Sequence, residues 1–269
     1  MKSRSAALLI GFALIAAACA APQAADSTPA KLRIAGSTSL QPTLNELATA
    51  YRAEHPQTVV EVLGGGTSIG IQELRAKESD LAAVSWKPED DQLPGDLQPI
   101  PVARDGLAII VNPQNTITNV TSLQLRALFL GETLDWGAVG GSGGEPVIIS
   151  REDGSGSRAA FETLAMVGEQ VTLNALVMPT SQAVVDYVAS HRSAIGYVST
   201  GLLTDTVRAV PVEEIAPTAA ALHSGEYRLG RVLYLYAPQA APPETRAFTD
   251  FVLSPAGQAI VAHRLIPVR

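Results

Sequence analysis

Short apolar runs that alternate with helical patterns constrain the fold of this chain more than any other feature. A strand is predicted over 32–35, and apolar residues then recur at helical spacing from Leu40 to Tyr51. Further strands are predicted over 59–63 and 81–84, with a helix over 69–76 between them. Alternation of this kind favours an α/β fold in which helices cover the faces of a mostly parallel sheet.

Two continuous apolar strands, at 106–111 and 231–237, lie far apart in the sequence and bracket a region with its own strand-and-helix pattern. We interpret them as two crossings between lobes. The first lobe then comprises residues 31–110 and 231–269, and the second comprises residues 111–230. Each lobe is expected to be a mostly parallel sheet flanked by helices.

The two crossing strands also predict how the lobes move. Because a hinge concentrates the dihedral change in a few residues at the ends of elements, we expect the lobes to close by bending at 111–113 and 237–238. Within the second lobe, the pattern predicts strands and helices at 147–149, 194–198, 122–129, 157–166 and 182–190.

The N-terminus has the pattern of an export signal. Lys2 and Arg4 make a basic start, a run of thirteen uncharged residues follows from Ala6 to Ala18, and small residues end it. That run is shorter than the roughly 20 residues that a helix needs to cross a bilayer. We therefore expect residues 1–18 to be a signal peptide and not part of the fold.

Cys19 follows this run directly and is the only cysteine in the chain. An intramolecular disulfide is therefore impossible, and the position of the residue needs another explanation. The segment resembles bacterial lipoprotein signals, which implies cleavage before Cys19 and acylation of its thiol; a plain signal peptide that is cut nearby is the alternative. Residues 20–30 consist of Ala, Pro, Gln, Asp, Ser and Thr, so residues 19–30 are interpreted as a lipidated cysteine with a flexible tether.

The net charge of −7, without any block rich in lysine or arginine, limits the kind of partner. Binding to a nucleic-acid backbone needs a clustered basic face, so nucleic acid is not an expected partner. An acidic chain of this kind binds an anion only through local dipoles and directed hydrogen bonds, which act at short range.

Three segments share one design, in which a strand runs into Gly, Ser and Thr and a helix begins at once: 35–39, 64–70 and 150–158. A helix N-terminus leaves backbone N–H groups unpaired and carries a partial positive charge. Glycine lets an anion approach the backbone, and hydroxyls add further donors. Each segment taken alone is better explained by helix capping. Three directed at one cleft would replace the hydrogen bonds that an oxyanion loses with its water.

The third segment also carries a charge. Arg151 supplies a permanently charged, forked donor that suits bidentate contact with a tetrahedral anion. Asp153 lies two residues further on, and we expect it to hold the guanidinium in place from behind. The alternative for these two residues is an exposed ion pair that contributes little.

The motifs belong to a longer ordered set, made of Gly36-Ser37-Thr38-Ser39-Leu40-Gln41-Pro42, Leu128-Phe129-Leu130-Gly131 with Trp136 and Gly140-Gly141, Arg151 to Arg158 with Phe161-Glu162, Ala194 to Ser199, and Leu233-Tyr234-Leu235-Tyr236. From Ile34 to the C-terminus, the chain resembles the phosphate-binding proteins of bacterial ABC transporters, which have the two-lobed type 2 periplasmic binding fold. The resemblance implies this α/β fold, capture of inorganic phosphate between the lobes, and delivery to a membrane permease. It also implies ligand contacts from Thr38, Ser39, Ser68, Arg151, Ser155, Gly156 and Ser157.

One position departs from the family pattern. Well-studied relatives place a ligand-contacting Asp where this chain has Ser85, and other relatives follow a Ser there with Arg, where this chain has Trp86. A carboxylate accepts the proton of phosphate and repels sulfate, whereas the Ser85 hydroxyl either accepts or donates and discriminates less sharply. Ser85 therefore joins the expected ligand contacts, and sulfate or another oxyanion is an alternative to phosphate.

No constellation for catalysis accompanies these motifs. The four histidines are scattered and have no cysteine partner, so neither a metal site nor a cofactor is expected. We therefore expect a binding protein and not an enzyme. Two alternatives of other classes are a phosphoester hydrolase that uses Ser155 and an adhesion or signalling module that kept the fold without the ligand.

The expected protein is an exported, monomeric lipoprotein at the cell envelope, either in the periplasm or at the outer face of the cytoplasmic membrane. Its expected partners are inorganic phosphate, the permease of an ABC phosphate transporter and, through the lipid anchor, the membrane itself.

Overall fold

The computed structural model describes residues 29–87 and 95–269. The predicted export signal, Cys19 and most of the tether lie outside the described residues. The described residues form the strands β1 (Ala30–Gly36), β2 (Thr58–Gly65), β3 (Leu81–Val84), β4 (Leu97–Val111), β5 (Val147–Arg151), β6 (Leu176–Met178), β7 (Ala194–Ser199), β8 (Arg208–Val210), β9 (Gly230–Pro238) and β10 (Ile266–Pro267).

The same residues form the α-helices α1 (Gln41–Glu54), α2 (Thr67–Ala76), α3 (Ser122–Leu130), α4 (Gly156–Leu164), α5 (Ser181–Ser190), α6 (Ala219–Ser224), α7 (Pro243–Leu253) and α8 (Pro255–Val261), and the 3-10 helices η2 (Trp136–Val139) and η3 (Thr200–Leu202). Within this described part of the chain, no helix combines the length and the apolar character that a membrane span requires.

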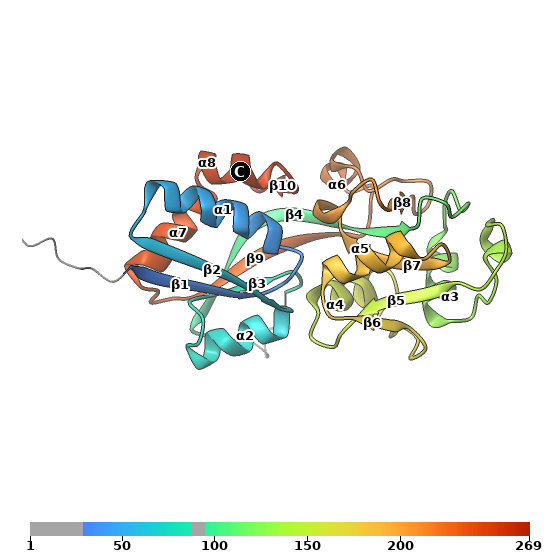
Figure 1. Cartoon of the computed structure of the whole chain (residues 1–269), viewed down its shortest axis with the longest axis horizontal. Helices are drawn as coiled ribbons and strands as arrows, with labels where there is room; N and C mark the ends of the chain where they lie inside the picture. Colours follow the sequence, from blue (N-terminus) through green and yellow to red (C-terminus); the bar gives the residue numbers. More distant parts are fainter. Residues whose placement is uncertain (1–28, 88–94) are drawn as a thin grey trace, which may run out of the picture.

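The strands follow one path through two lobes, in the order β2-β1-β3-β9-β4-β7-β5-β6, with β8 and β10 beside β4 (Figure 1). In the first lobe, β1 pairs in parallel with β2 and β3. In the second lobe, β5 pairs in parallel with β6 and β7. The two long strands β4 and β9 run antiparallel to their neighbours and to each other. The α/β fold predicted from the sequence is therefore confirmed, with antiparallel pairing added by the two crossing strands.

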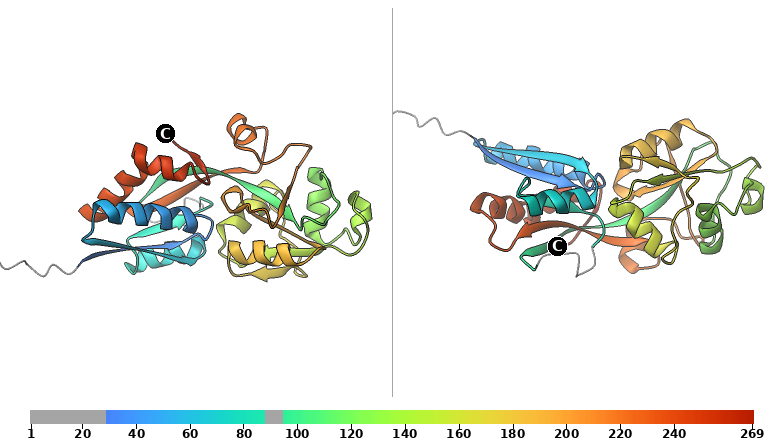
Figure 2. Two further views of the ribbon diagram at one scale, coloured as in Figure 1. Left: turned by 45° about the horizontal axis from the view of Figure 1, so that its top comes forward. Right: turned by 90° about the horizontal axis from the view of Figure 1, so that it is seen from below.

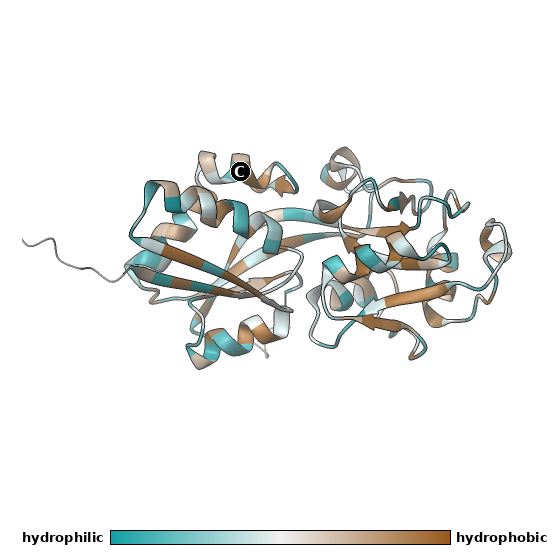
Figure 3. Cartoon of the chain, in the orientation of Figure 1, coloured by the Kyte–Doolittle hydropathy of each residue, from teal (hydrophilic) through white to brown (hydrophobic). Residues whose placement is uncertain are grey.

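Helices cover the sheets because their apolar faces meet the apolar faces of the strands. In the first lobe, α1 buries Leu44 and Leu47 in a core that it shares with Ile34 of β1. In the second lobe, the rings of Phe161 on α4 and Tyr197 on β7 stack with their centroids 4.1 Å apart. Figure 3 shows the apolar strands inside both lobes and many polar residues on the covering helices.

The crossing between the lobes lies at two glycines. β4 pairs with β9 up to Gly106, which lies opposite Gly230. It then pairs with β7 and β8 from Leu107 to Val111. A Cβ atom at Gly106 would lie 2.9 Å from the methyl carbons of Leu222, so a side chain there would displace this packing. Figure 2 shows the connection between the lobes from two further directions.

The bends predicted at 111–113 and 237–238 do not coincide with this crossing. Val111 pairs with Ile195 inside the second lobe, and Ala237 pairs with Gln98 inside the first lobe. The apolar run 106–111 of β4 is buried in the second lobe. The crossing therefore lies at Gly106, where this run begins. Strand pairing thus changes lobe at Gly106, earlier than the predicted boundary at residue 110.

Candidate functional site

Four helix N-termini meet where the two lobes face each other. The loop 37–39 leads into α1, Thr67 begins α2, Ser155 caps α4, and Ser181 begins α5 after its capping residue Thr180. Each N-terminus presents backbone N–H groups without partners inside the helix, together with the positive end of the helix dipole. Because α1 and α2 belong to the first lobe and α4 and α5 to the second, both lobes contribute donors.

Direct hydrogen bonds join the lobes at this point. The hydroxyl oxygens of Ser39 and Ser157 lie 2.9 Å apart, and those of Thr38 and Ser181 lie 3.0 Å apart. The backbone N–H of Ser181 also donates to Thr38 Oγ1 at 3.1 Å. All four residues are buried. The structure therefore brings the predicted residues Thr38, Ser39 and Ser157 together, and adds Ser181, which the sequence analysis missed.

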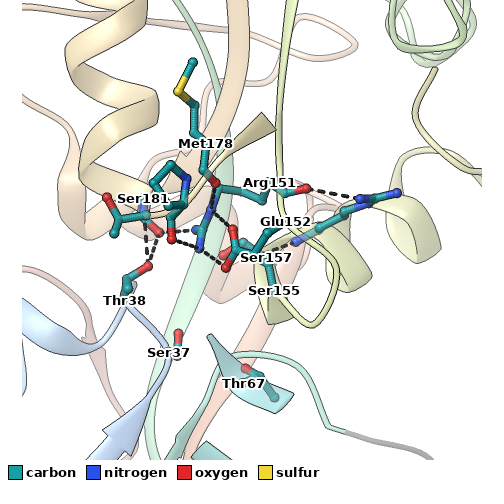
Figure 4. Close-up of polar contacts among 12 residues, drawn as sticks. Ser37, Thr38, Thr67, Arg151, Glu152, Ser155, Ser157, Met178 and Ser181 are labelled. Atoms are coloured by element: carbon teal, nitrogen blue, oxygen red, sulfur yellow. Dashed lines mark hydrogen bonds and ion pairs between the residues drawn. The ribbon is translucent and has the colours of Figure 1, made fainter. Parts of the chain in front are cut away.

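Arg151 is the last residue of β5, and only 2% of it is exposed. Its Nη1 donates to Ser181 Oγ at 2.8 Å, and its Nε donates to the carbonyl of Met178 at 3.0 Å. Glu152 occupies another edge of the guanidinium, with Nε 2.8 Å from Oε2 and Nη2 2.8 Å from Oε1. Figure 4 shows the guanidinium between Ser181 and Glu152, on the side of the second lobe that faces Thr38.

Asp153 does not support Arg151, so this prediction is wrong. The Oδ1 atom of Asp153 pairs with Arg158 Nη1 at 2.6 Å, and 94% of the Asp153 side chain is exposed. Asp153 lies in the turn after β5, beyond the end of the strand, whereas Glu152 is adjacent to Arg151 and folds back along its guanidinium. Glu152 is the carboxylate that accompanies Arg151.

Thr67 and Ser68 of the second loop both face the second lobe, but only the Thr67 side chain is buried. Thr67 is buried, and its Oγ1 accepts the backbone N–H of Ser85 at 3.1 Å. A Cβ atom on Gly156 would collide with the hydroxyl oxygens of Thr67 and Ser85, so only glycine fits opposite them. Ser68 is exposed, and its backbone N–H donates to the carbonyl of Gly154 at 3.1 Å. The burial pattern thus distinguishes two neighbouring hydroxyls that the sequence alone does not.

Ser155 and Trp86 line the mouth of the cleft. Ser155 Oγ accepts the backbone N–H of Arg158 at 3.4 Å, which makes Ser155 the N-cap of α4. Ser155 also lines a cavity of about 430 Å³, together with Gly156, Ser68 and Trp86. Trp86 follows β3 in the first lobe and packs against the core of the second lobe. The cavity is therefore bounded by both lobes.

A second buried arginine, which the sequence analysis missed, lies directly behind the hydroxyls. Arg231, near the start of β9, donates from Nε and Nη2 to Asp105 Oδ2 at 3.0 and 2.8 Å. Its Nη1 donates to Ser157 Oγ at 3.0 Å and its Nη2 to Ser39 Oγ at 3.2 Å. Burial lowers the pKa of the Arg231 guanidinium, and the charge of Asp105 opposes this effect. The one sequence signal for Arg231 is a charged residue at the start of an apolar strand.

This arrangement is suited to holding an anion without chemical change. Buried hydroxyls, helix N-termini and guanidinium groups supply donors from both lobes, and a tetrahedral oxyanion presents four oxygen atoms to such donors. In residues 29–87 and 95–269, no group of three or more His, Cys, Asp or Glu side chains is arranged to hold a metal ion. The Ser155 hydroxyl serves as a helix cap, and none of its described hydrogen bonds joins it to a general base.

The fold and the site define a class. Residues 21–256 match the model of the PBP superfamily domain, and the chain belongs to this superfamily.

Among curated proteins, the chain is 26% identical over 264 residues to the phosphate-binding protein PstS of Bacillus subtilis, covering 92% of this chain and 87% of that protein. It is 27% identical to PstS of Pseudomonas aeruginosa, covering 89% and 83%.

Solved structures of phosphate transport proteins are also similar to this chain. A protein from Clostridium perfringens, described as a candidate phosphate ABC transporter substrate-binding protein with bound phosphate, superposes with a TM-score of 0.85 at 30% identity. The match covers 89% of this chain and 100% of that one. An ABC-type phosphate transport receptor from Vibrio cholerae superposes with a TM-score of 0.73, also at 30% identity, over 87% of this chain and 99% of the other.

Proposed function

We propose that this chain captures inorganic phosphate in the cleft between its lobes and delivers it to the membrane permease of an ABC importer. The observation that carries the proposal is the buried Arg151 guanidinium, which lies among hydroxyls and helix N-termini from both lobes. The names of the similar proteins agree with it, since those of Bacillus subtilis and Pseudomonas aeruginosa are phosphate-binding proteins. The protein is proposed to act as a monomeric receptor and not as an enzyme.

The proposed ligand contacts come from both lobes. Thr38, Ser39 and Ser85 lie on the first lobe, and Arg151 lies on the second with the N-terminus of α4, which presents Ser155, Gly156 and Ser157. The burial of Thr67 and Ser181 beside these residues adds both to the set. Ser68 keeps a place at the mouth of the cleft, through its backbone N–H and its position in the cavity wall.

A second candidate ligand is sulfate, and the observation that favours it is Ser85. This residue is buried, and its hydroxyl faces Gly156 across the cleft. Sulfate is fully deprotonated at neutral pH and needs donors only, whereas phosphate also carries a proton that needs an acceptor. A hydroxyl in place of a carboxylate removes the repulsion that rejects sulfate.

The decisive experiment for the proposed function is a calorimetric titration of the purified protein with phosphate and, in parallel, with sulfate at several pH values. We expect saturable binding of one phosphate ion per chain and weaker binding of sulfate. Sulfate binding as tight as phosphate binding would favour the second candidate. No heat with either anion would overturn the proposal, and turnover of an aryl phosphate would favour a hydrolase.

We also propose that the protein is exported and attached to the envelope through an acylated Cys19. The support is in the sequence: a lone cysteine follows an export signal and precedes a polar tether. In cells given a radioactive fatty acid, wild-type protein should be labelled and should sediment with membranes, whereas Cys19→Ser should lose both properties. A labelled, membrane-bound Cys19→Ser protein would refute the proposed anchor.

A further inference from the structure

We propose that Arg231 is a positioning residue of the anion site: through Ser39 and Ser157 it aligns hydroxyl donors from the two lobes toward the bound anion. The proposal rests on the proposed function, because it assigns a role within the same anion-binding cleft. It concerns a residue that lies outside the three glycine-rich loops and comes from a crossing strand.

The hydroxyls in question form a continuous chain across the cleft. Thr38, Ser181, Ser39 and Ser157, here called the hydroxyl chain, have successive oxygen distances of 3.0, 3.4 and 2.9 Å. Two oxygens lie on the first lobe and two on the second. The chain therefore exists only while the lobes are together, which is the state in which an anion would be enclosed.

Every oxygen of the hydroxyl chain accepts a hydrogen bond from a guanidinium group or from a backbone N–H. Arg231 Nη1 donates to Ser157 Oγ and Arg231 Nη2 donates to Ser39 Oγ, at 3.0 and 3.2 Å. Arg151 Nη1 donates to Ser181 Oγ at 2.8 Å, and the N–H of Ser181 donates to Thr38 Oγ1 at 3.1 Å. A hydroxyl oxygen that already accepts an N–H bond directs its own proton elsewhere.

The proton count shows the consequence. The hydroxyl chain has four protons, and its three oxygen–oxygen contacts use three of them. Of the eight lone pairs of these oxygens, four accept guanidinium and backbone N–H groups and three accept hydroxyl protons, so the remaining proton is available to an anion. Without Arg231, Ser39 and Ser157 are free to turn their lone pairs toward the ligand, and a lone pair repels an anion.

The placement of Arg231 is difficult to explain as support for the fold alone. Its partner Asp105 already accepts, through Oδ1, hydrogen bonds from Ser199 Oγ at 2.9 Å, from Thr200 Oγ1 at 2.8 Å and from the N–H of Thr200 at 3.1 Å. Arg231 is fully enclosed, and it directs N–H groups to one hydroxyl of each lobe. A desolvated ion pair is costly, and replacement by apolar residues is often neutral or stabilising.

The test separates the charge balance of the pair from the presence of the guanidinium. Arg231→Gln removes the cation and leaves the buried Asp105 carboxylate without a positive charge to balance it. The double variant Asp105→Asn/Arg231→Gln removes both charges, and Asp105→Asn alone keeps the cation. Arg228→Gln, which removes an exposed arginine three positions away, is the matched control. Each purified protein is titrated with inorganic phosphate by calorimetry and melted in parallel.

We expect phosphate affinity to depend on whether the Arg231 guanidinium is present, and stability to depend on whether the buried charges are balanced. Arg231→Gln and the double variant should both bind phosphate about tenfold or more weakly, the scale of a lost hydrogen bond to a charged group. Asp105→Asn should bind more tightly than wild type, because a negative charge near the anion is gone. The double variant should melt closer to wild type than Arg231→Gln does. Arg228→Gln should match wild type in affinity and melting temperature.

A coupling measurement tests the route through the hydroxyls. In a Ser39→Ala/Ser157→Ala background, the further loss of affinity caused by replacing Arg231 should shrink, because the groups that it aligns are absent. If the double variant Asp105→Asn/Arg231→Gln folds and binds phosphate as wild type does, the role of Arg231 is refuted while the proposed function stands. If wild type binds no anion, both fail together.

Discussion

The two buried arginines of the cleft are held in opposite ways. Arg151 pairs with Glu152, its neighbour in the sequence, and 28% of the Glu152 side chain is exposed. Arg231 pairs with Asp105, which lies 126 residues away, and neither of these side chains has any exposure. Water therefore partly screens the first pair, whereas the second pair is desolvated and fixed by the two crossing strands.

This difference assigns a different task to each cation. Arg151 lies at the end of β5 beside a glycine-rich turn, where direct contact with a ligand needs no rearrangement of the sheet. Arg231 lies on β9, one of the two strands that connect the lobes, next to Gly230 at the crossing. We therefore expect Arg151 to dominate the binding free energy, and Arg231 to affect both the stability of the protein and the alignment of its donors.

The largest expected difference between the two arginines is in the stability of the protein. Arg231→Gln should lower the free energy of unfolding by about 3–5 kcal/mol, because Asp105 is left as an uncompensated buried charge. Arg151→Gln should cost distinctly less, since water reaches Glu152. Urea denaturation followed by circular dichroism measures both values. Equal losses for the two variants would show that the two pairs do not differ in the way described.

For phosphate affinity we expect the reverse order: replacing Arg151 should cost more than replacing Arg231. Arg151→Ala should weaken phosphate affinity by about 2–5 kcal/mol, the range for losing one partner of a buried, hydrogen-bonded charge contact. Arg151→Lys should recover only part of this loss, because a point charge does not reproduce the guanidinium fork. Arg126→Ala, at an exposed pair with Glu169, is the control and should bind as wild type does. Calorimetric affinities within twofold of wild type for Arg151→Ala would contradict the proposal.

A smaller effect distinguishes two neighbouring hydroxyls of α2. Thr67→Val removes a buried hydroxyl and should cost about 1–3 kcal/mol of phosphate binding, as should Thr38→Ala and Ser155→Ala. Ser68→Ala should cost little, because the Ser68 side chain is exposed and its backbone N–H remains. The same titration checks this pair. A larger loss for Ser68→Ala than for Thr67→Val would mean that the second loop faces the ligand differently.

Selectivity provides a further test, at Ser85. Ser85→Asp should raise the ratio of phosphate affinity to sulfate affinity, because a carboxylate accepts the phosphate proton and repels sulfate. The measurement is a pair of titrations with the two anions at the same pH. An unchanged ratio would mean that Ser85 does not contact the ligand, and that the position of Gly156 opposite its hydroxyl has no bearing on recognition.

The smallest expected effect is a change of shape. If the lobes close by bending at Gly106 and Gly230, saturating phosphate should reduce the radius of gyration measured by small-angle X-ray scattering. The control is the same titration on Arg151→Ala, which should show the change only at higher phosphate. An identical radius with and without saturating phosphate would argue against a hinge at the crossing.

Much of the first lobe and of the glycine-rich loops could be predicted from the sequence, because their signals are local. The strand over 81–84 has the predicted bounds. Apolar periodicity is read within a dozen residues, and helix capping within three or four. Thr180 and Ser181 also carry a readable capping signal, which would have placed Ser181 at the start of α5.

The features that were not predicted are either very short strands or contacts that depend on distant residues or on a single-residue boundary. β6 and β8 each contain three residues and β10 contains two, too few to establish a period. The pairing of Arg231 with Asp105 depends on how two distant strands align, which no local pattern encodes. The choice of Glu152 over Asp153 depends on where β5 ends, and the choice of Thr67 over Ser68 depends on the first residue of α2. Single-residue boundaries of this kind are the least predictable part of a sequence.

A crystal structure of the protein grown with phosphate tests the central claim most directly. The account predicts one phosphate ion between the lobes, within hydrogen-bonding distance of Arg151 and of hydroxyls from both lobes, including Thr67 and Ser157. It also predicts that Arg231 keeps its contacts to Ser39 and Ser157 behind the ion. Phosphate bound elsewhere, or bound in the cleft without contact to Arg151, would contradict the account.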